Sequence, residues 1–445
     1  MTPEFTIKRS IYQGSVLGPI KCSVSLDTLG RDSLKDNSEQ CVVYKYKDAV
    51  EVPPLGMMDD VLSVSKCGIK SIEMNATINA KIEGKKLRLK EEKCHKIHVA
   101  NGKVKNPKCE TKLFAHDKEI KQVSELKYLG DVASDSLGFE VTIREREAKA
   151  IGIRSQIHSI LKGVSLGHFY YQVAFILRES LFINGILTNI ETYSPVREKD
   201  IKVLMKCDTD LVKSLFNVKS FTYELLYFES GKLPIQFVIA QRRFMYLWQI
   251  VTRKRSDLIH KIYQLQQLKP TSGEWAVMMK REKEKYGVSL TDEEISNLSK
   301  QQFKQNVNEK VHQFAFSYLL SLGQTHSKSH NIINSLKSKK LETQTYLLTS
   351  LLTTSQRQLL FSLRTKSYDV KSNYKKKYEH NMTCRSCNLP GSFEDERHLT
   401  QCPTINIDNP NELNIEDIYS KLDDQVKFIK YFEKIHIKRQ LLEEL

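Results

Sequence analysis

A group of three cysteines and one histidine near residue 400 constrains the fold more than any other feature. The segment TCRSCNLPGSFEDERHLTQCP has the spacing Cys384-x2-Cys387-x10-His398-x3-Cys402. Thiolates and imidazole are preferred ligands of Zn²⁺, and the last two residues can share one helical turn. Three of the nine cysteines gather here. The pattern predicts a structural zinc site with all four positions filled by the protein; a chance grouping of thiols is the alternative.

Cations and aromatic rings alternate just before this cluster, in RTKSYDVKSNYKKKYEH. Cations neutralise phosphates and tyrosines stack on unpaired bases, so the segment predicts a nucleic-acid surface without strong sequence readout. A solvated, lysine-rich helix end is the alternative. The residues assigned to this surface are Arg364, Lys366, Tyr374, Lys375, Lys376 and Lys377, with Tyr368, Lys371 and Tyr378 between and beside them. Gln241–Arg243 is a further basic stretch, and its aromatic neighbours are expected in a helical core.

The net charge also indicates an anionic partner of large extent. Lysine and arginine exceed aspartate and glutamate by 69 − 53 = 16 among 445 residues, and 40% of the residues are hydrophobic, enough for a real core. A high lysine content for solubility alone is the other interpretation. The amino terminus lacks a signal-peptide core, and charges at Arg178 and Glu179 interrupt the most apolar stretch. We therefore expect no membrane span and no secretion, with nucleic acid (RNA and DNA) as the leading partner. The cysteines outside the cluster are scattered and form no disulfide framework, so we expect a reducing intracellular compartment. The oligomeric state is open.

Hydrophobic periodicity predicts an α+β protein. Residues 1–135 carry short apolar runs broken by glycine, proline and charge, which is typical of strands and turns. From about residue 141 the period is helical, with Ile153, Ile157, Ile160 and Leu161 on one face. Thr291 and Glu294 form a predicted capping box that starts one long helix. The serine- and lysine-rich stretch from residue 324 predicts a mobile connection.

A pair of adjacent aspartates interrupts an apolar run in PPLGMMDDVLSVS. Flanking strands predict a β-hairpin with Asp59 and Asp60 at its tip. Aspartate is a common turn residue, and that interpretation suffices for an isolated pair. The functional alternative is that hard oxygen ligands on a rigid hairpin bind Mg²⁺ and position a nucleoside triphosphate.

The order of four motifs resembles the palm of reverse transcriptases from non-LTR (LINE-type) retrotransposons. These are YQGSVLGP, the x-Asp-Asp hairpin, the lysine strand in KKLRLKEEKCHKIHV, and the Tyr-Leu-Gly hairpin in VSELKYLGDVAS. The stretches LRESLFINGILTNIETY and LLYFESGKLPIQFVIAQRRFMYLWQI are similar to the thumb and carboxy-terminal helices of the same family. The Cys/His cluster is similar to its zinc knuckle. The resemblance covers most of residues 11–403.

The resemblance implies an RNA-directed DNA polymerase of a transposable element, a nucleotidyltransferase that uses Mg²⁺ and acts on chromosomal DNA in the nucleus. It implies that Asp59 binds the metal and that Asp60 is its neighbour, which contacts the metal less directly. Gln13 and Gly14 match the family's segment near the templating base pair. Lys93 falls in the strand whose lysine lies near the phosphates, and Tyr128 with Gly130 matches the hairpin that braces the primer end. A solvated lysine and a half-buried strand tyrosine are the alternatives for Lys93 and Tyr128.

The catalytic set is expected to be incomplete. Two-metal catalysis in the family takes an aspartate from an earlier strand, whereas none stands among the twelve residues before Gln13, and Asp27 suits a surface or cap position better. We expect a fragment that is inactive alone. The alternatives are a nucleic-acid-binding protein acting through residues 364–402, or a decayed element copy without a selected function. The expected segments are a partial palm (1–135), a thumb-like helical region (136–255), a helical connector with a basic tail (256–380), a zinc knuckle (381–403) and a helical tail (404–445).

Overall fold

The computed structural model describes most of the chain after residue 41. The described residues are 42–45, 49–52, 55–57, 60–64, 68–84, 89–98, 111–128, 130–135, 139–163, 166–194, 197–218, 222–268, 274–336, 338–378, 381–409 and 412–444. The chain divides into two compact units, which we describe separately. Unit 1 draws on Met1–Thr142 and Ile250–Met278, and unit 2 on Ile143–Gln249 and Met279–Leu445. Each unit is made of two stretches that are separated in the sequence. This division does not test the five consecutive segments expected from the sequence, which remain a prediction.

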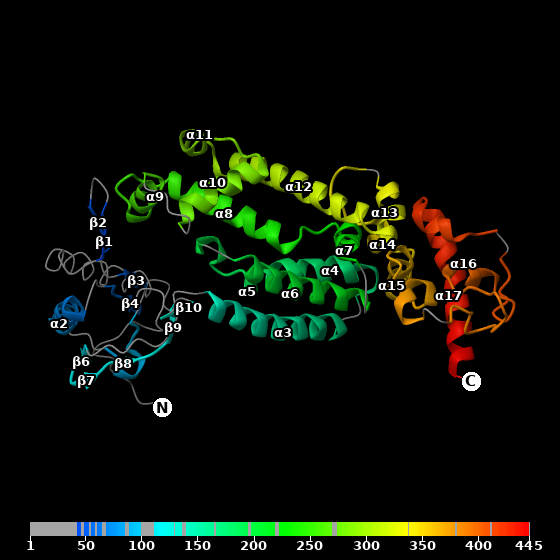
Figure 1. Cartoon of the computed structure of the whole chain (residues 1–445), viewed down its shortest axis with the longest axis horizontal. Helices are drawn as coiled ribbons and strands as arrows, with labels where there is room; N and C mark the ends of the chain where they lie inside the picture. Colours follow the sequence, from blue (N-terminus) through cyan, green and yellow to red (C-terminus); the bar gives the residue numbers. More distant parts are fainter. Residues whose placement is uncertain are drawn as a thin grey trace, which may run out of the picture. The chain divides into compact units, whose positions relative to one another are not determined.

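The described part of unit 1 contains short paired strands and the helices α2 and α9 (Figure 1). Four of its strand pairs are antiparallel (β1–β2, β3–β4, β6–β7 and β9–β10), and β5 pairs with β8 in parallel. The elements are β1 (Val42–Lys45), β2 (Ala49–Val52), β3 (Leu55–Met57), β4 (Asp60–Leu62), α2 (Gly68–Gly84), the 3₁₀ turn η1 (Glu91–Lys93), β5 (His95–Lys96), β6 (Phe114–Ala115), β7 (Lys118–Glu119), β8 (Lys121–Gln122), β9 (Glu125–Tyr128), β10 (Asp131–Ser134) and α9 (Leu258–Leu268).

Two predicted hairpins are present in unit 1. In the first, β3 and β4 pair with Met57 opposite Asp60, which leaves a two-residue connection. In the second, β9 and β10 pair with Tyr128 opposite Asp131, and Gly130 in the turn has φ +88°. Such a backbone conformation favours glycine, because a side chain would be strained there. The apolar runs that flank the paired aspartates predicted the first strand pair, and the family resemblance implied the second.

One face of α2 packs inward in unit 1. Met74, Ile78 and Ile82 recur every four residues and are buried, with Leu89 against them. On the same helix, Asn75 and Asn79 both donate hydrogen bonds of 2.8 Å to the carbonyl of Phe114. The apolar spacing and these two amides together fix α2 beside the start of β6.

Unit 2 is helical in its described part. Its described elements include five short 3₁₀ segments and one π-helical stretch. They are α3 (Glu140–Gly163), η2 (Gly167–Phe169), α4 (Tyr170–Leu177), the π-helix η3 (Arg178–Ile183), α5 (Asn184–Ile186), η4 (Ile190–Thr192), α6 (Glu198–Phe216), α7 (Tyr223–Ser230), α8 (Ile235–Val251), α10 (Trp275–Tyr286), α11 (Asp292–Asn297), α12 (Lys300–Gln324), η5 (Ser327–Ser329), α13 (His330–Ser335), α14 (Thr345–Leu348), α15 (Thr354–Arg364), η6 (Lys371–Lys377), α16 (Glu396–Gln401), η7 (Ile415–Tyr419) and α17 (Leu422–Glu444). The described chain is mostly helical with small sheets, which is compatible with the expected α+β class. None of the described helices is both long and apolar enough to cross a bilayer.

The predicted long helix after residue 291 is two helices. The capping box of Thr291 and Glu294 is present and starts α11. A second capping box, Ser299 with Gln302, starts α12 after a break at Leu298, whose φ and ψ are extended. Each box satisfies amide groups that a helix start leaves unpaired, so the second one ends the continuity that apolar spacing alone predicts.

The predicted mobile connection from residue 324 is wrong in its first half, because this stretch is folded. It forms η5 and α13, and both Ser329 and Ile332 are fully buried. The Ser329 hydroxyl donates a 2.6 Å hydrogen bond to the buried carboxylate of Glu224 on α7. The high serine content favoured a mobile, solvent-exposed segment, but the Ser329 hydroxyl is buried and bonds to a buried carboxylate instead of to water.

The charges within the apolar stretch of residues 166–190 have different partners. Arg178 is 1% exposed, and its guanidinium donates two 2.7 Å hydrogen bonds to the carboxylate of Asp208 on α6. Tyr227 donates a third hydrogen bond, of 2.8 Å, to the same carboxylate. Glu179 pairs with Lys232 at 3.1 Å. Both charges of this apolar stretch are therefore paired with groups on other segments, and the Arg178–Asp208 pair is buried.

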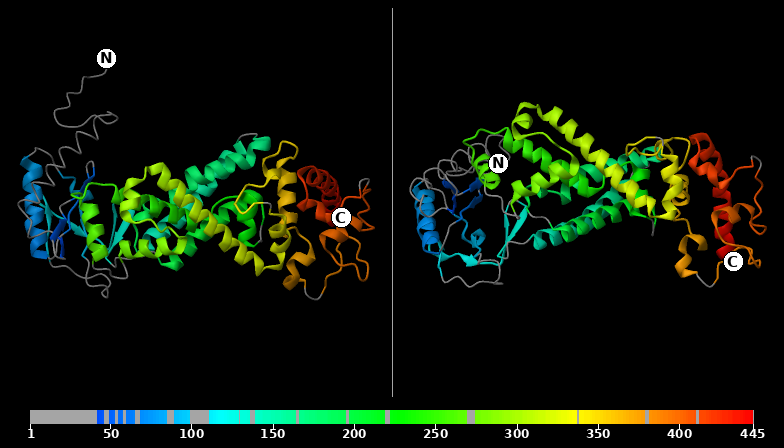
Figure 2. Two further views of the ribbon diagram at one scale, coloured as in Figure 1. Left: turned by 90° about the horizontal axis from the view of Figure 1, so that it is seen from above. Right: turned by 45° about the horizontal axis from the view of Figure 1, so that its top comes forward.

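The carboxy-terminal part of unit 2 shares one hydrophobic core. Phe216 stacks on Phe361 with ring centroids 3.8 Å apart, and Tyr368 packs edge-on against Phe432. α17 lies beside α15 in both views of Figure 2, in agreement with their contacts. Cys384 and Cys402 belong to this same core, so the Cys/His segment is built into the helical unit.

Candidate metal centre and nucleic-acid interface

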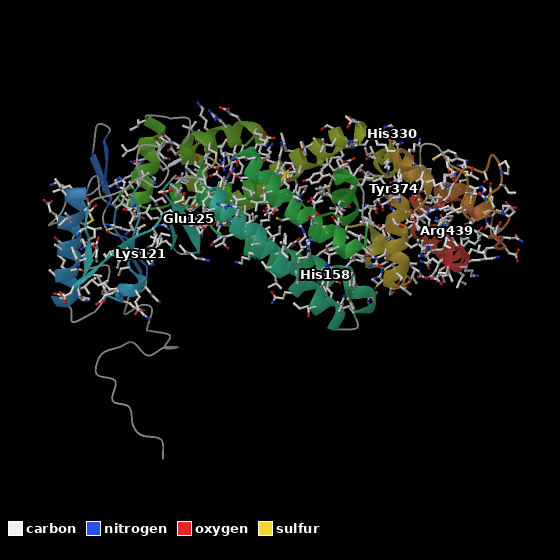
Figure 3. All side chains as sticks on the ribbon, turned by 60° about the horizontal axis from the view of Figure 1, so that its bottom comes forward. Lys121, Glu125, His158, His330, Tyr374 and Arg439 are labelled. Carbon is white, nitrogen blue, oxygen red and sulfur yellow. The ribbon has the colours of Figure 1, made fainter. Side chains whose placement is uncertain are left out.

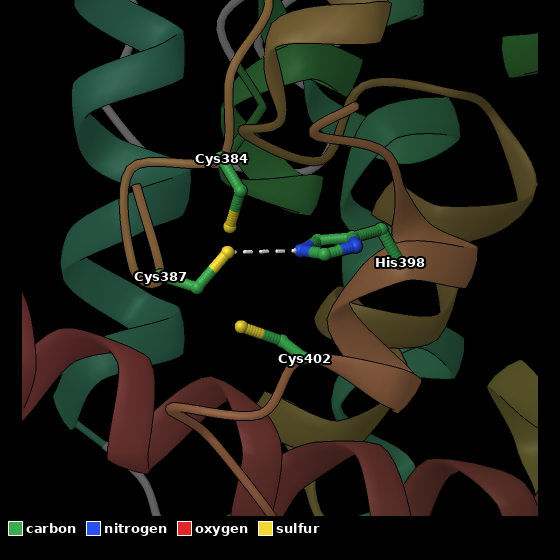
Figure 4. Close-up of side chains that lie close together, drawn as sticks. All are labelled: Cys384, Cys387, His398 and Cys402. Carbon is green, nitrogen blue, oxygen red and sulfur yellow. Dashed lines mark hydrogen bonds between the residues drawn. The ribbon is translucent and has the colours of Figure 1, made fainter. Parts of the chain in front are cut away.

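Four side chains converge on one point near the end of the chain. The ligand atoms of Cys384, Cys387, His398 and Cys402 all lie within 4.8 Å of one another. Cys387 Sγ is 3.5 Å from His398 Nε2, and the other two sulfur atoms face the same space (Figure 4). A tetrahedral zinc with bonds of about 2.3 Å to sulfur needs ligand atoms spaced at about this scale. The residues fit the metal that their spacing predicts.

A tight loop positions the first two cysteines. The chain reverses between Thr383 and Phe393, which form an antiparallel bridge. The Cys384 amide donates to the Ser392 carbonyl at 2.9 Å. Gly391, with φ +78°, makes the turn possible because a side chain would be strained in this conformation. The loop therefore holds both thiols on one side of a closed turn.

A short helix positions the other two ligands. α16 begins after Asp395, whose carboxylate accepts a 2.6 Å hydrogen bond from the His398 amide. This N-cap orients the first turn, and Cys402 follows at the end of the helix. One helical turn separates the imidazole from the thiol, as the x3 spacing requires.

The cysteines differ in their protonation when no metal is bound. Burial alone would raise the pKa of Cys387, but hydrogen bonding with the Ser392 hydroxyl and the Leu389 backbone outweighs it and lowers the pKa to about 6. Burial raises the pKa of Cys402 to about 11. Zinc needs thiolates, so metal binding would release the Cys402 proton. Four protein ligands leave no open position, so the centre suits a structural role.

A buried carboxylate ties the loop to α17. Glu394 is fully buried and accepts hydrogen bonds from Arg385 of the loop (2.6 Å) and from Arg439 of α17 (3.1 Å). Burial alone would raise the pKa of Glu394, but the Arg385 hydrogen bonds outweigh it and hold the pKa below its ordinary value. Figure 3 labels Arg439 in this part of the chain. We call residues 381–409 the metal module.

Arg364 does not face solvent, so its assignment to phosphate contact is corrected. Its side chain is 2% exposed and pairs with Glu229 on α7, with Nε and Nη2 each 2.9 Å from the carboxylate. Tyr346 donates to the same carboxylate at 2.7 Å, and the Ile418 carbonyl accepts from Nη1. This arginine joins α15 to α7 and η7 instead.

The neighbouring Lys366 and Tyr374 are half-buried. Lys366 has φ +53° and its ammonium lies 3.3 Å from the Glu396 carboxylate. Tyr374, labelled in Figure 3, donates its hydroxyl to the Ser367 carbonyl at 3.0 Å. Lys328 lies over the Tyr374 ring, 5.8 Å from its centroid. Protein groups already engage both predicted residues, although part of each remains accessible.

Lys375, Lys376 and Lys377 are exposed, as a nucleic-acid surface needs. They lie at the end of η6, and we call them the lysine triplet. Lys377 also lies over the ring of Tyr378, 5.0 Å from its centroid. Three adjacent lysines of the predicted positive surface are therefore accessible to a partner.

Hydrogen bonds fasten η6 to the metal module. Lys371 is 6% exposed and donates to the Thr383 carbonyl at 2.7 Å, next to the first ligand. The Ser372 amide donates to the Glu394 carbonyl at 3.1 Å, and Asn373 donates to the Glu396 carboxylate at 2.7 Å. The lysine triplet and the metal centre are thus one structural piece.

The other predicted site residues lie in unit 1 or outside the described part of the chain. Gln13, Gly14 and Asp59 lie outside the described residues, and of Asp60 only the backbone, at the start of β4, is described. Lys93 is exposed in η1, just before the two-residue strand β5. Tyr128 and Gly130 lie at the β9–β10 turn.

Sequence reasoning missed the groups that support the module. Glu394 with its two arginines and the exposed ring of Phe393 were not singled out. The acidic stretch that follows Phe393 was visible, but the arginine partner on α17 lies 45 residues further along the chain. Comparison with protein-family models, with curated proteins and with solved structures finds no match to this chain.

Proposed function

We propose that the protein binds nucleic acid through the metal module and the lysine triplet, and that it derives from the carboxy-terminal portion of a LINE-type reverse transcriptase. One observation carries the binding function: three exposed lysines end a turn that is hydrogen-bonded to a closed Cys₃His cluster. Flexible lysines lose less entropy on binding phosphates when their backbone is already fixed. The excess of 16 positive charges over the whole chain favours the same kind of partner.

Salt dependence of binding tests this proposal. Fluorescence anisotropy with a labelled single-stranded RNA is compared for the zinc-loaded wild type and a variant with Lys375, Lys376 and Lys377 replaced by alanine. Each phosphate contact releases counterions, so the logarithm of the association constant falls as the logarithm of the salt concentration rises. Loss of three contacts should make the slope of this plot less steep by about 2.

A matched variant controls for net charge. It replaces the exposed Lys300, Lys304 and Lys310 of α12 by alanine, which removes the same charge from another element. We expect its slope to stay close to that of the wild type. Equal loss in both variants would mean that binding follows the total charge of the chain and not this surface.

RNA-templated DNA synthesis is a second candidate function, favoured by the β3–β4 and β9–β10 hairpins in the order that the resemblance implies. Asp59 would hold Mg²⁺ in that activity, with Asp60 beside it, and the site of action would be chromosomal DNA in the nucleus. Primer extension with Mg²⁺ tests it, comparing wild type with Asp59→Ala and with Asp117→Ala, an exposed aspartate of another hairpin. Synthesis lost only in Asp59→Ala would establish the activity.

A further inference from the structure

An open pocket lies beside the metal centre. It has a volume of about 350 Å³ and is lined by Lys375, Lys376, Met382 and Phe393. Phe393 is 47% exposed, although large apolar side chains are usually buried. The pocket therefore combines two ammonium groups, a thioether and an accessible aromatic face.

Backbone hydrogen bonds hold the walls of this pocket in place. Met382 and Phe393 stand on the two arms of the cysteine loop, where the Glu394 amide donates to the Met382 carbonyl at 2.9 Å. The lysine wall is fastened by the Ser372 amide, which donates to the Glu394 carbonyl at 3.1 Å. Because the backbone is fixed before binding, a ligand does not have to order it.

The charges of the pocket are open to an anion. Within the described part of the chain, Lys375 and Lys376 form no ion pair with a carboxylate, and both are exposed. The nearby carboxylate of Glu394 is fully buried and paired with arginines. A phosphate beside these ammonium groups would not have to displace a carboxylate of the described residues from an ion pair with them.

We propose that this pocket binds one unpaired nucleotide of a single-stranded nucleic acid, with its base stacked on Phe393 and its phosphate at Lys375 and Lys376. This inference rests on the proposed function and narrows its substrate class. A pocket of this size holds one nucleotide, and a base within a duplex cannot present its face to a ring. The walls are loop arms and a 3₁₀ turn, whereas readout of the major groove uses a helix or a β-ribbon.

Substitution of the ring tests the proposal. The zinc-loaded full chain is titrated with labelled oligo(U) RNA, oligo(dT) DNA, a duplex, and an oligonucleotide that contains abasic sites. Phe393→Ala should weaken binding of both single strands roughly tenfold, while Phe393→Trp keeps it. The control is Phe169→Ala, because Phe169 is an equally exposed (51%) phenylalanine on η2, outside the metal module, and this variant should bind like the wild type. The abasic strand should not distinguish Phe393→Ala from wild type.

The outcomes separate this pocket from the broader proposal. If Phe393→Ala binds single strands like Phe169→Ala while loss of the lysine triplet still weakens binding, the nucleotide pocket is wrong and the nucleic-acid function stands. If Phe393→Ala weakens duplex and single strand alike, or if acidic polyglutamate displaces RNA equally well, stacking of an unpaired base is also wrong. No binding to any oligonucleotide would overturn both proposals. Unchanged zinc content in Phe393→Ala confirms that the variant is folded.

Discussion

At the scale of single residues, the environment of each cysteine decides what its loss should do. Cys384 is fully buried and Cys387 half-buried, and both point into the cluster of Figure 4. Replacing both with serine should reduce the zinc content from about one ion per chain to near zero, because two oxygen donors cannot replace two thiolates. Metal analysis of the purified protein measures this.

The matched control for that experiment is Cys207→Ser. Cys207 is half-buried on α6 and lies outside the cluster, and burial raises the pKa of its thiol to about 11. We expect its zinc content to equal that of the wild type. Zinc retained by the double variant, or lost equally in the control, would contradict the assignment of the cluster as the metal site.

The sequence predicted the grouping of the four Cys/His side chains better than it predicted which cations are exposed, for a physical reason. The four ligands lie within 19 residues, so a local spacing contains most of the geometry. Arg364, by contrast, pairs with Glu229, 135 residues away, and no local pattern shows that partner. The free or buried state of an arginine depends on the tertiary packing around it.

At the scale of elements, a glycine at the end of α7 allows two segments to cross. Gly231 has φ +66°, and a Cβ there would lie 2.0 Å from the backbone nitrogen of Thr343. The Thr343 hydroxyl donates to the Ser230 carbonyl at 2.8 Å, which holds the crossing together. Gly231→Ala should therefore destabilise unit 2 by the left-handed strain of about 1–2 kcal/mol and by about 1–3 kcal/mol more, since the neighbouring backbone must move.

Gly287→Ala separates these two causes. Gly287 follows α10 with φ +67°, and nothing lies within 4 Å of an added Cβ. This variant should lose only the stability that the left-handed strain costs, about 1–2 kcal/mol. Urea unfolding followed by circular dichroism compares the two variants. Equal losses would mean that the contact with Thr343 carries no cost.

Element prediction succeeded where the determining signal is local. A capping box acts within four residues, and it predicted the start of α11. The apolar runs around the paired aspartates predicted the β3–β4 hairpin, whereas the β9–β10 hairpin was implied by the family resemblance. The helical face of α3 was predicted in part: Ile157 and Leu161 are buried, but Ile160 is 38% exposed. Apolar spacing gives the period of a helix, whereas the neighbours that cover each residue come from elsewhere in the chain.

At the scale of the whole molecule, the metal module and the carboxy-terminal helices pack into one shared core. Cys384 and Cys402 belong to the same hydrophobic core as Phe428 and Phe432 of α17. The ion pair of Glu394 with Arg439 adds a buried polar link between the loop and that helix. Leaving either partner of such a pair alone is costly, so loss of the loop structure should be felt in α17.

Removal of zinc should therefore loosen more than the metal module. With a chelator, we expect faster amide hydrogen exchange in residues 381–409 and also in α17, because opening the cluster exposes shared core and unpairs Arg439. α2, which packs around Met74 and Ile78 in unit 1, serves as an internal reference and should keep its exchange rate. In Cys384→Ser, both regions should exchange fast already, and a chelator should add nothing. Faster exchange confined to residues 381–409 would mean that α17 is held by its apolar contacts alone and that the Glu394 link does not couple the metal to the rest of the core.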